Sequence, residues 1–151
     1  MEMAEMIDQR LISLNLDVTN KEDAIQKICR MMYDAGKVSD YDQYLNGVKN
    51  RETEFATGMG NGIAIPHCKN DCVKEAAFTL VKLKNPVDWG SLDDEPVDYV
   101  IMLAAPESSD NVHLKMLSEL AVSLMDDNFR ESLKDAADVE QIINIFKSRK
   151  E

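Results

Sequence analysis

Hydrophobic and polar residues follow two different periods in the first part of the chain. Residues 11–16 alternate strictly, which is typical of a strand with one buried face. Apolar side chains then recur at helical spacing over residues 24–35, after an N-cap at Thr19 or Asn20 and before Gly36. The pattern therefore predicts a strand followed by an amphipathic helix.

The remainder of the chain continues as a succession of strands and helices. After Gly36 the predicted elements are a helix from a cap at Ser39 or Asp40 to Glu52, strands over residues 63–65, 76–83 and 97–105, and helices over residues 114–124, 129–133 and 139–146. Asp110 or Asn111 and, later, Asp138 are the expected caps of the final helices. Pro66 is expected to stop the first of these strands, and residues 86–96 to form a loop with at most an edge segment.

Residues 100–103 are apolar on both faces of their predicted strand. Such a strand is typical of the middle of a sheet that helices cover on each side. The predicted fold class is therefore α/β, with a mixed central β-sheet flanked by helices on both faces. We expect a single domain over residues 1–151.

Composition limits the classes of partner. The chain has 17 Lys and Arg against 28 Asp and Glu, a formal net charge of −11. An acidic protein repels phosphate backbones and anionic lipid headgroups, so nucleic acid and membrane surfaces are poor partners. No apolar run approaches the ~18 residues that span a bilayer. The N-terminus is acidic where a signal peptide would be basic, and the number of cysteines, 3, is odd. These features predict a cytoplasmic protein with reduced thiols and no direct membrane insertion.

Gly58, Gly60 and Gly62 alternate with other residues just before an apolar segment. Alternating glycines permit tight turns or a close approach of backbone to a ligand, and the spacing alone favours neither. Ile63 occupies the position of the third glycine in the dinucleotide-binding pattern, and no Gly-Lys-Ser/Thr follows as in a Walker loop. No nucleotide and no other cofactor is therefore predicted.

The 2 histidines of the chain have contexts suited to chemistry. His67 follows a short strand, and strand ends are where α/β proteins commonly place their sites. His113 lies in the predicted first turn of a helix, whose unpaired N–H groups favour an anion. Either histidine alone is more often a packed or surface residue, but the two contexts together favour a shared site. Cys68 and Cys72 are four residues apart with no second pair, which argues against zinc, and no serine near His113 lies in a nucleophile elbow.

Two segments taken together give the strongest indication of function. The first is Arg51-Glu52 followed by a run from Thr57 to His67 that reads Thr-Gly-Met-Gly-Asn-Gly-Ile-Ala-Ile-Pro-His. The second contains Leu-Ala-Ala-Pro and, a few residues later, His113-Leu-Lys. These segments resemble the active-site signature and the second histidine segment of the enzyme IIA proteins of the fructose/mannitol family. That family is part of the bacterial phosphoenolpyruvate-dependent sugar phosphotransferase system (PTS), and the resemblance extends over nearly the whole chain.

The resemblance implies a phosphoryl relay, a phosphotransferase activity. His67 would accept a phosphoryl group from the phosphocarrier protein HPr and pass it to a cysteine of the cognate IIB component of a sugar permease, for uptake of a fructose- or mannitol-type sugar. His113 would orient or stabilise the phosphoryl group, and Arg51 would neutralise its charge. The phosphate pocket would be shaped by Thr57 and the backbone of Gly58, Gly60 and Gly62.

The chemistry of these residue types agrees with such roles. A neutral imidazole, with an ordinary pKa near ~6.5, is a nucleophile at neutral pH. Arginine supplies a fixed fork of donors for phosphate oxygens, and phosphoryl transfer depends mainly on positioning and charge neutralisation. The basic residues close in sequence to the site, expected to give it a positive potential, are Lys49, Arg51, Lys69 and Lys115.

Two alternatives stay open at this point. A regulatory, nitrogen-type IIA protein would use the same histidine, with its phosphorylation state controlling a protein partner. A non-catalytic binding domain would carry both histidines as structural residues. Cys68 stands where the family often has a small residue or glycine, and we expect an inert thiol there.

Overall fold

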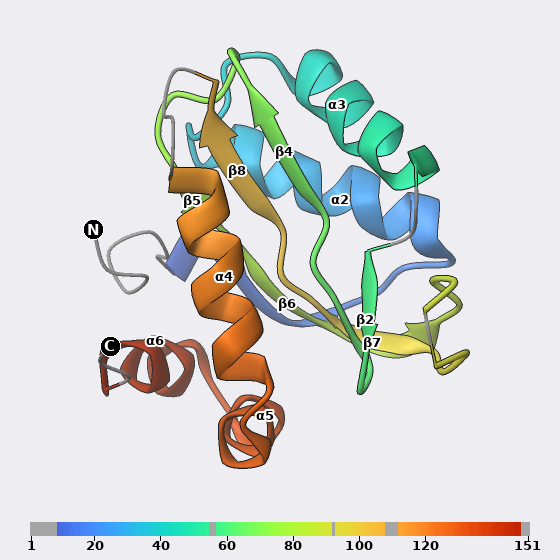
Figure 1. The fold of residues 1–151 in the computed structure, drawn as a ribbon, viewed down its shortest axis with the longest axis vertical. Coiled ribbons are helices and arrows are strands. Elements are labelled where there is room, and N and C mark those ends of the chain that lie inside the picture. Colours follow the sequence, from blue (N-terminus) through green and yellow to red (C-terminus); the bar gives the residue numbers. More distant parts are fainter. Residues whose placement is uncertain (1–8, 55–56, 92, 108–111, 149–151) are drawn as a thin grey trace.

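The structure, a computed structural model, describes residues 9–54, 57–91, 93–107 and 112–148. Its helices lie in two layers on opposite sides of the strands (Figure 1). One layer contains α2 (Lys21–Asp34) and α3 (Tyr41–Glu54), and the other contains α4 (Val112–Leu124), α5 (Asp127–Asp135) and α6 (Val139–Ser148). A 3-10 turn, η1 (Gln9–Leu11), precedes the first strand. Within these described residues, no helix is both long and apolar enough to cross a membrane.

The strands form two hydrogen-bonded sheets, and the chain passes back and forth between them. The larger sheet has five strands in the order β1-β6-β7-β3-β2, and the smaller has three in the order β4-β8-β5. Their bounds are β1 (Ile12–Leu16), β2 (Gly58–Gly60), β3 (Ile63–Ala64), β4 (His67–Asn70), β5 (Ala77–Phe78), β6 (Leu80–Val87), β7 (Val97–Val100) and β8 (Leu103–Pro106). The pairs β1–β6, β3–β7 and β4–β8 are parallel, whereas β2–β3, β5–β8 and β6–β7 are antiparallel. The predicted mixed strand directions are therefore confirmed, with the sheet divided in two.

Consecutive residues at the centre of the fold face opposite cores. Val100 and Met102 belong to the apolar cluster that includes residues of α2 and α3. Ile101 and Leu103 belong to the cluster that includes residues of α4, α5 and α6. All four side chains are fully buried. This alternation confirms that the segment is covered on both faces, as its continuous apolar run predicted. The single strand predicted over residues 97–105 is divided into β7 and β8, which belong to different sheets.

Side-chain caps begin several helices where the sequence placed them. Asn20, Asp40 and Asp138 each accept a hydrogen bond from the backbone N–H three residues later, at 2.8, 3.0 and 2.9 Å. Each bond satisfies one of the N–H groups that a helix start leaves without an intrahelical acceptor. The predicted cap of α4, Asp110 or Asn111, lies outside the described residues.

The expectation about Pro66 is confirmed, and the one about Pro86 is wrong. β3 ends at Ala64, before Pro66, and the chain then enters the smaller sheet as β4. Pro86 lies inside β6 and not in a loop. The pairing of β6 with β1 ends before this proline, and its register with β7 shifts around it. The ladders of these described strands therefore do not require the N–H that proline lacks.

Candidate functional site

The glycine-rich segment forms a hairpin beside the site. β2 and β3 pair in an antiparallel manner, and the turn between them has positive φ angles at Gly60 (94°), Asn61 (59°) and Gly62 (77°). The tight turn that the sequence allowed is therefore present at two of the three glycines. Gly58 serves a close approach instead, because a Cβ atom there would lie 2.1 Å from the Oγ of Ser91.

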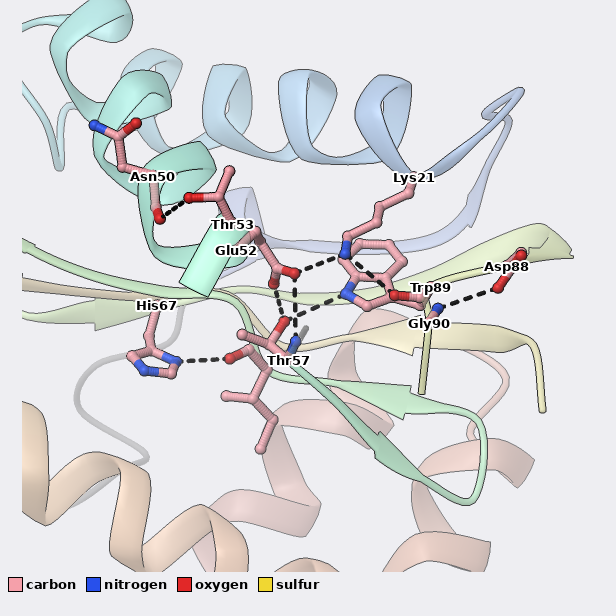
Figure 2. A network of polar contacts seen from close by, with 10 residues as sticks. Lys21, Asn50, Glu52, Thr53, Thr57, His67, Asp88, Trp89 and Gly90 are labelled. Atoms are coloured by element: carbon pink, nitrogen blue, oxygen red, sulfur yellow. Dashed lines mark hydrogen bonds and ion pairs between the residues drawn. The ribbon is translucent and has the colours of Figure 1, made fainter. Parts of the chain in front are cut away.

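His67 is the first residue of β4, and only 8 % of its surface is exposed. Its Nδ1 lies 2.8 Å from the carbonyl oxygen of Ile65 (Figure 2). A carbonyl only accepts hydrogen bonds, so Nδ1 carries the proton of the neutral ring and Nε2 carries the lone pair. Burial is the main cause that lowers the pKa of His67. The bond to the Ile65 carbonyl opposes it, and the charges of Arg51 and Glu52 have smaller effects, the first lowering and the second raising the pKa. The ring is therefore neutral at neutral pH, with Nε2 as its nucleophilic atom.

A surface pocket of about 410 Å³ brings His67 and Arg51 together. The remaining lining residues are Gly47, Asn50, Glu54, Cys68, Lys69 and Asn70. Arg51 lies in the last turn of α3, with its guanidinium 3.8 Å from the carboxylate of Glu54. Because β4 is an edge strand of its sheet, a long side chain from α3 can share this pocket with His67. The predicted nucleophile and the predicted phosphate-neutralising cation thus occupy one site.

The other expected basic residues are distributed differently. Lys69 is exposed and lines the pocket, whereas Lys49 pairs with Glu22 at 2.9 Å. Lys115 is exposed on α4, 3.9 Å from Glu119. Positive charge at the pocket itself is thus supplied by Arg51 and Lys69 of the described side chains.

His113 is the second residue of α4, in the helical first turn that the sequence predicted. Its side chain is not among those that the structure describes. Cys68 belongs to the core on the α2 and α3 side, so its strand neighbour His67 faces the opposite side. That is the side on which α4 lies against β8 (Figure 1). The structure therefore places the start of α4 and the His67 ring on the same face of the sheet.

Thr57 lies behind the site and does not line the pocket, and neither do the three glycines, as far as the described residues show. Its Oγ–H donates to the Glu52 carboxylate, which also accepts the Thr57 N–H at 3.3 Å. The Thr57 Oγ in turn accepts from the Nε1–H of Trp89 at 3.3 Å. The Thr57 carbonyl accepts the N–H of Ile65 at 3.1 Å. Thr57 therefore supports the segment that carries His67.

Lys21, Glu52 and Trp89 also belong to this arrangement, although their sequence positions predicted a role for none of them. Lys21 Nζ lies 2.7 Å from the Glu52 carboxylate and donates to the Trp89 carbonyl at 3.1 Å (Figure 2). A signal for Glu52 was present in the sequence. It follows the buried Tyr44 and Val48 at intervals of four residues, which puts a carboxylate on the buried stripe of α3.

Cys68 packs against α3, where a Cβ on Gly47 would lie 2.6 Å from its Sγ. Burial raises the pKa of the Cys68 thiol to about 11, so it is protonated and weakly reactive at neutral pH. Across the described part of the chain, no three His, Cys, Asp or Glu side chains gather as they would around a metal ion.

Comparison with known proteins identifies the family. The family described as "Phosphoenolpyruvate-dependent sugar phosphotransferase system, EIIA 2" matches residues 5–149. The PTS system fructose-specific EIIABC component of Bacillus subtilis is 37% identical over 97% of this chain, which spans only 23% of that relative's length. The mannitol-specific phosphotransferase enzyme IIA component of Staphylococcus aureus is 32% identical, over 95% of this chain and 96% of its own length.

Solved structures share the same fold. The nitrogen regulatory protein IIA-Ntr from Neisseria meningitidis has a TM-score of 0.88 at 26% identity, covering 95% of this chain and 97% of that one. Enzyme IIAMTL from Escherichia coli, solved in complex with phosphorylated enzyme IIBMTL, has a TM-score of 0.80 at 22% identity, covering 95% of this chain and 98% of that one.

The matched region therefore includes every described helix and strand, both histidines and the pocket between α3 and β4. Relatives that are specific for fructose and for mannitol are similar along nearly all of this chain. The chain belongs to the EIIA 2 family of the phosphoenolpyruvate-dependent sugar phosphotransferase system, whose members are phosphotransferase components.

Proposed function

We propose that this chain is a cytoplasmic phosphoryl carrier that works as a single domain over residues 1–151. Nε2 of His67 accepts a phosphoryl group from phospho-HPr and passes it to a cysteine of a cognate IIB component. The relay serves the uptake of a fructose- or mannitol-type sugar. The names of the relatives from B. subtilis and S. aureus support the sugar class. The E. coli complex with phosphorylated IIBMTL supports the kind of acceptor.

The observation that carries this proposal is the hydrogen bond from His67 Nδ1 to the Ile65 carbonyl, at 2.8 Å. It fixes the tautomer in which Nε2 is the nucleophile, in a ring whose lowered pKa keeps it neutral. Arg51 lines the same pocket and offers a fork of donors to phosphate oxygens.

The transfer proceeds in two displacements at phosphorus. The Nε2 lone pair forms an N–P bond as the bond from phosphorus to the donor histidine of HPr breaks, and its electron pair stays with the donor. His67 keeps its Nδ1 proton and becomes cationic, with the Ile65 carbonyl accepting from it. The thiolate of the IIB cysteine then attacks phosphorus, and the N–P electron pair returns to Nε2. Positioning and charge neutralisation, by Arg51 and by His113 from the start of α4, are the contributions that such a transfer needs.

The test is a phosphorylation assay with phosphoenolpyruvate, enzyme I and HPr on wild type and His67→Ala. We expect an acid-labile, base-stable label on wild type and none on the variant, whose circular dichroism should be unchanged. Label on His67→Ala would show that a residue other than His67 is the nucleophile. No label on wild type, with active relay proteins, would mean that the domain binds without catalysis.

A regulatory function is the second candidate, because the IIA-Ntr structure from N. meningitidis has a TM-score of 0.88. Both candidates require the same phosphohistidine, so the label alone does not separate them. Transfer from phosphorylated wild type to purified fructose- or mannitol-type IIB does. Rapid loss of label to IIB supports transport, and retention of label in its presence supports regulation.

A further inference from the structure

Glu52 is a carboxylate held almost out of solvent next to the proposed site. Only 6 % of its side chain is exposed, and it lies 2.7 Å from Lys21 Nζ, whose own side chain is 29 % exposed. A carboxylate in such a position is costly unless it is paired and hydrogen-bonded. It also accepts the N–H and the Oγ–H of Thr57, so its two oxygens receive three donors.

The same groups are fixed from a second direction by Trp89. The indole Nε1–H donates to the Thr57 Oγ at 3.3 Å, and the Trp89 carbonyl accepts from Lys21 Nζ at 3.1 Å. Lys21 Nζ also lies 5.3 Å from the centre of the indole ring. The Thr57 hydroxyl thus has one acceptor and one donor in defined places, which fixes the direction of its proton. Lys21, Glu52, Thr57 and Trp89, called here the Glu52 network, come from α2, α3 and the segments before β2 and after β6.

Thr57 connects the Glu52 network to His67 through the backbone. Its carbonyl accepts the N–H of Ile65 at 3.1 Å, and the carbonyl of Ile65 accepts the Nδ1–H of His67 at 2.8 Å. The other side of this segment is held by the chain from the end of β7 to the start of β8. The N–H groups of Ile101 and Leu103 donate to the carbonyls of Ala64 and Pro66, each at 2.9 Å. Because the Ile65 N–H donates to Thr57, the position of Thr57 bears directly on the Ile65 carbonyl, which sets the histidine tautomer.

We infer that the Glu52 network is a positioning device for His67. It holds Thr57, and through Ile65 it holds the carbonyl that keeps the proton on Nδ1 and presents Nε2 to the phosphoryl donor. None of its side chains touches the phosphoryl group; they act through His67. The functional role of the Glu52 network rests on the proposed phosphoryl transfer. The tautomer of His67 can be measured without any transfer.

Thr57→Val is the variant that tests it, with Thr57→Ser as the matched control. Valine has nearly the shape of threonine but leaves the Trp89 Nε1–H without its acceptor and Glu52 without the hydroxyl donor. Serine keeps both hydrogen bonds. Glu52→Gln is the second variant, because an amide has one acceptor oxygen where the carboxylate has two, and it cannot receive all three donors.

The tautomer of His67 is read from 15N shifts of histidine-labelled protein at a pH above the imidazole pKa. The chain has 2 histidines, so His67→Ala assigns the signals. We expect a single Nδ1–H tautomer in wild type and Thr57→Ser, and a mixture of tautomers in Thr57→Val and Glu52→Gln. Phosphoryl acceptance should become about tenfold slower in Thr57→Val and Glu52→Gln, as expected when one hydrogen bond that positions His67 is lost. Thr57→Ser should stay within about twofold of wild type.

The outcomes distinguish the positioning role of the Glu52 network from the proposed phosphoryl transfer. A lower melting temperature in Thr57→Val and Glu52→Gln, with tautomer and acceptance rate as in wild type, would overturn the positioning role and leave a structural one. A labelled wild type with two tautomers would overturn it as well. Failure of wild type to accept phosphate would overturn the proposed function instead, whatever tautomer is measured. A mixed tautomer together with slower transfer, both reversed in Thr57→Ser, would support the inference.

Discussion

Gly47 is required to be glycine by the sulfur atom of Cys68. It lies within α3, where alanine is ordinarily favoured over glycine by about 1 kcal/mol. A Cβ atom at this position would lie 2.6 Å from Cys68 Sγ and 3.1 Å from Asn70 Nδ2. Gly47→Ala must therefore displace Cys68 or move β4 away from the helix, directly beside His67.

The magnitude follows from two opposing effects. An extra methyl group in a packed contact costs about 1–3 kcal/mol, against the helical gain of about 1 kcal/mol. Gly47→Ala alone should therefore lower the free energy of unfolding by up to about 2 kcal/mol. In a Cys68→Ala background the sulfur is gone, and only the milder contact with Asn70 remains. There the same substitution should be neutral or stabilising by up to about 1 kcal/mol, which makes the coupling about 1–3 kcal/mol.

Urea denaturation of wild type, both single variants and the double variant measures this coupling. The denaturant slopes must agree among the four proteins for the comparison to hold. Phosphoryl acceptance should follow the same pattern, slower in Gly47→Ala and recovered in the double variant, because Cys68 and His67 are neighbours on β4. An equal cost of Gly47→Ala in both backgrounds, within about 0.5 kcal/mol, would refute the contact.

Three further predictions concern the site. Because burial and then Arg51 lower the pKa of His67 from its ordinary 6.5, acceptance should persist into mildly acidic solution. Removing that positive charge in Arg51→Met makes protonation easier, so the acid limb of the pH–rate profile should move to higher pH; a limb that stays or moves lower contradicts this sign. His113→Ala should still accept phosphate but more slowly, and an acceptance rate equal to wild type would remove its proposed role. Peroxide should leave acceptance unchanged because burial raises the pKa of Cys68 to about 11, and a loss that Cys68→Ala abolishes would show a reactive thiol.

Patterns that depend on near neighbours in sequence were predictive of the fold. The caps at Asn20, Asp40 and Asp138 bind an N–H only three residues away, so the residue types suffice to locate them. Pro86 was misjudged because the cost of a proline in a strand depends on whether a partner strand needs its N–H. The register between β6 and β7 decides this, and the residues next to Pro86 in sequence do not reveal that register.

The same division applies to the site. The context of His67, after glycines and at the start of a strand, was visible in the sequence, whereas its hydrogen bond to Ile65 depends on the path of the backbone through Pro66. The Glu52 network joins residues as far apart as Lys21 and Trp89, and no local pattern connects them. Glu52 itself was marked by its place beside Arg51 in the motif and by its spacing on the buried stripe of α3.

Arg51 and Glu52 are adjacent and oppositely charged, but their side chains have different surroundings. Successive residues on a helix point about 100° apart, so Glu52 faces Lys21 in the interior while Arg51 faces the pocket. The ion pair that Arg51 makes there, 3.8 Å from Glu54, involves a carboxylate whose side chain is 69 % exposed. Such pairs contribute about 0–1 kcal/mol, so a phosphoryl dianion on His67 could displace Glu54 at small cost. If Glu52 pointed the same way, a second carboxylate would compete for the guanidinium; its burial against Lys21 leaves Arg51 better able to neutralise phosphate.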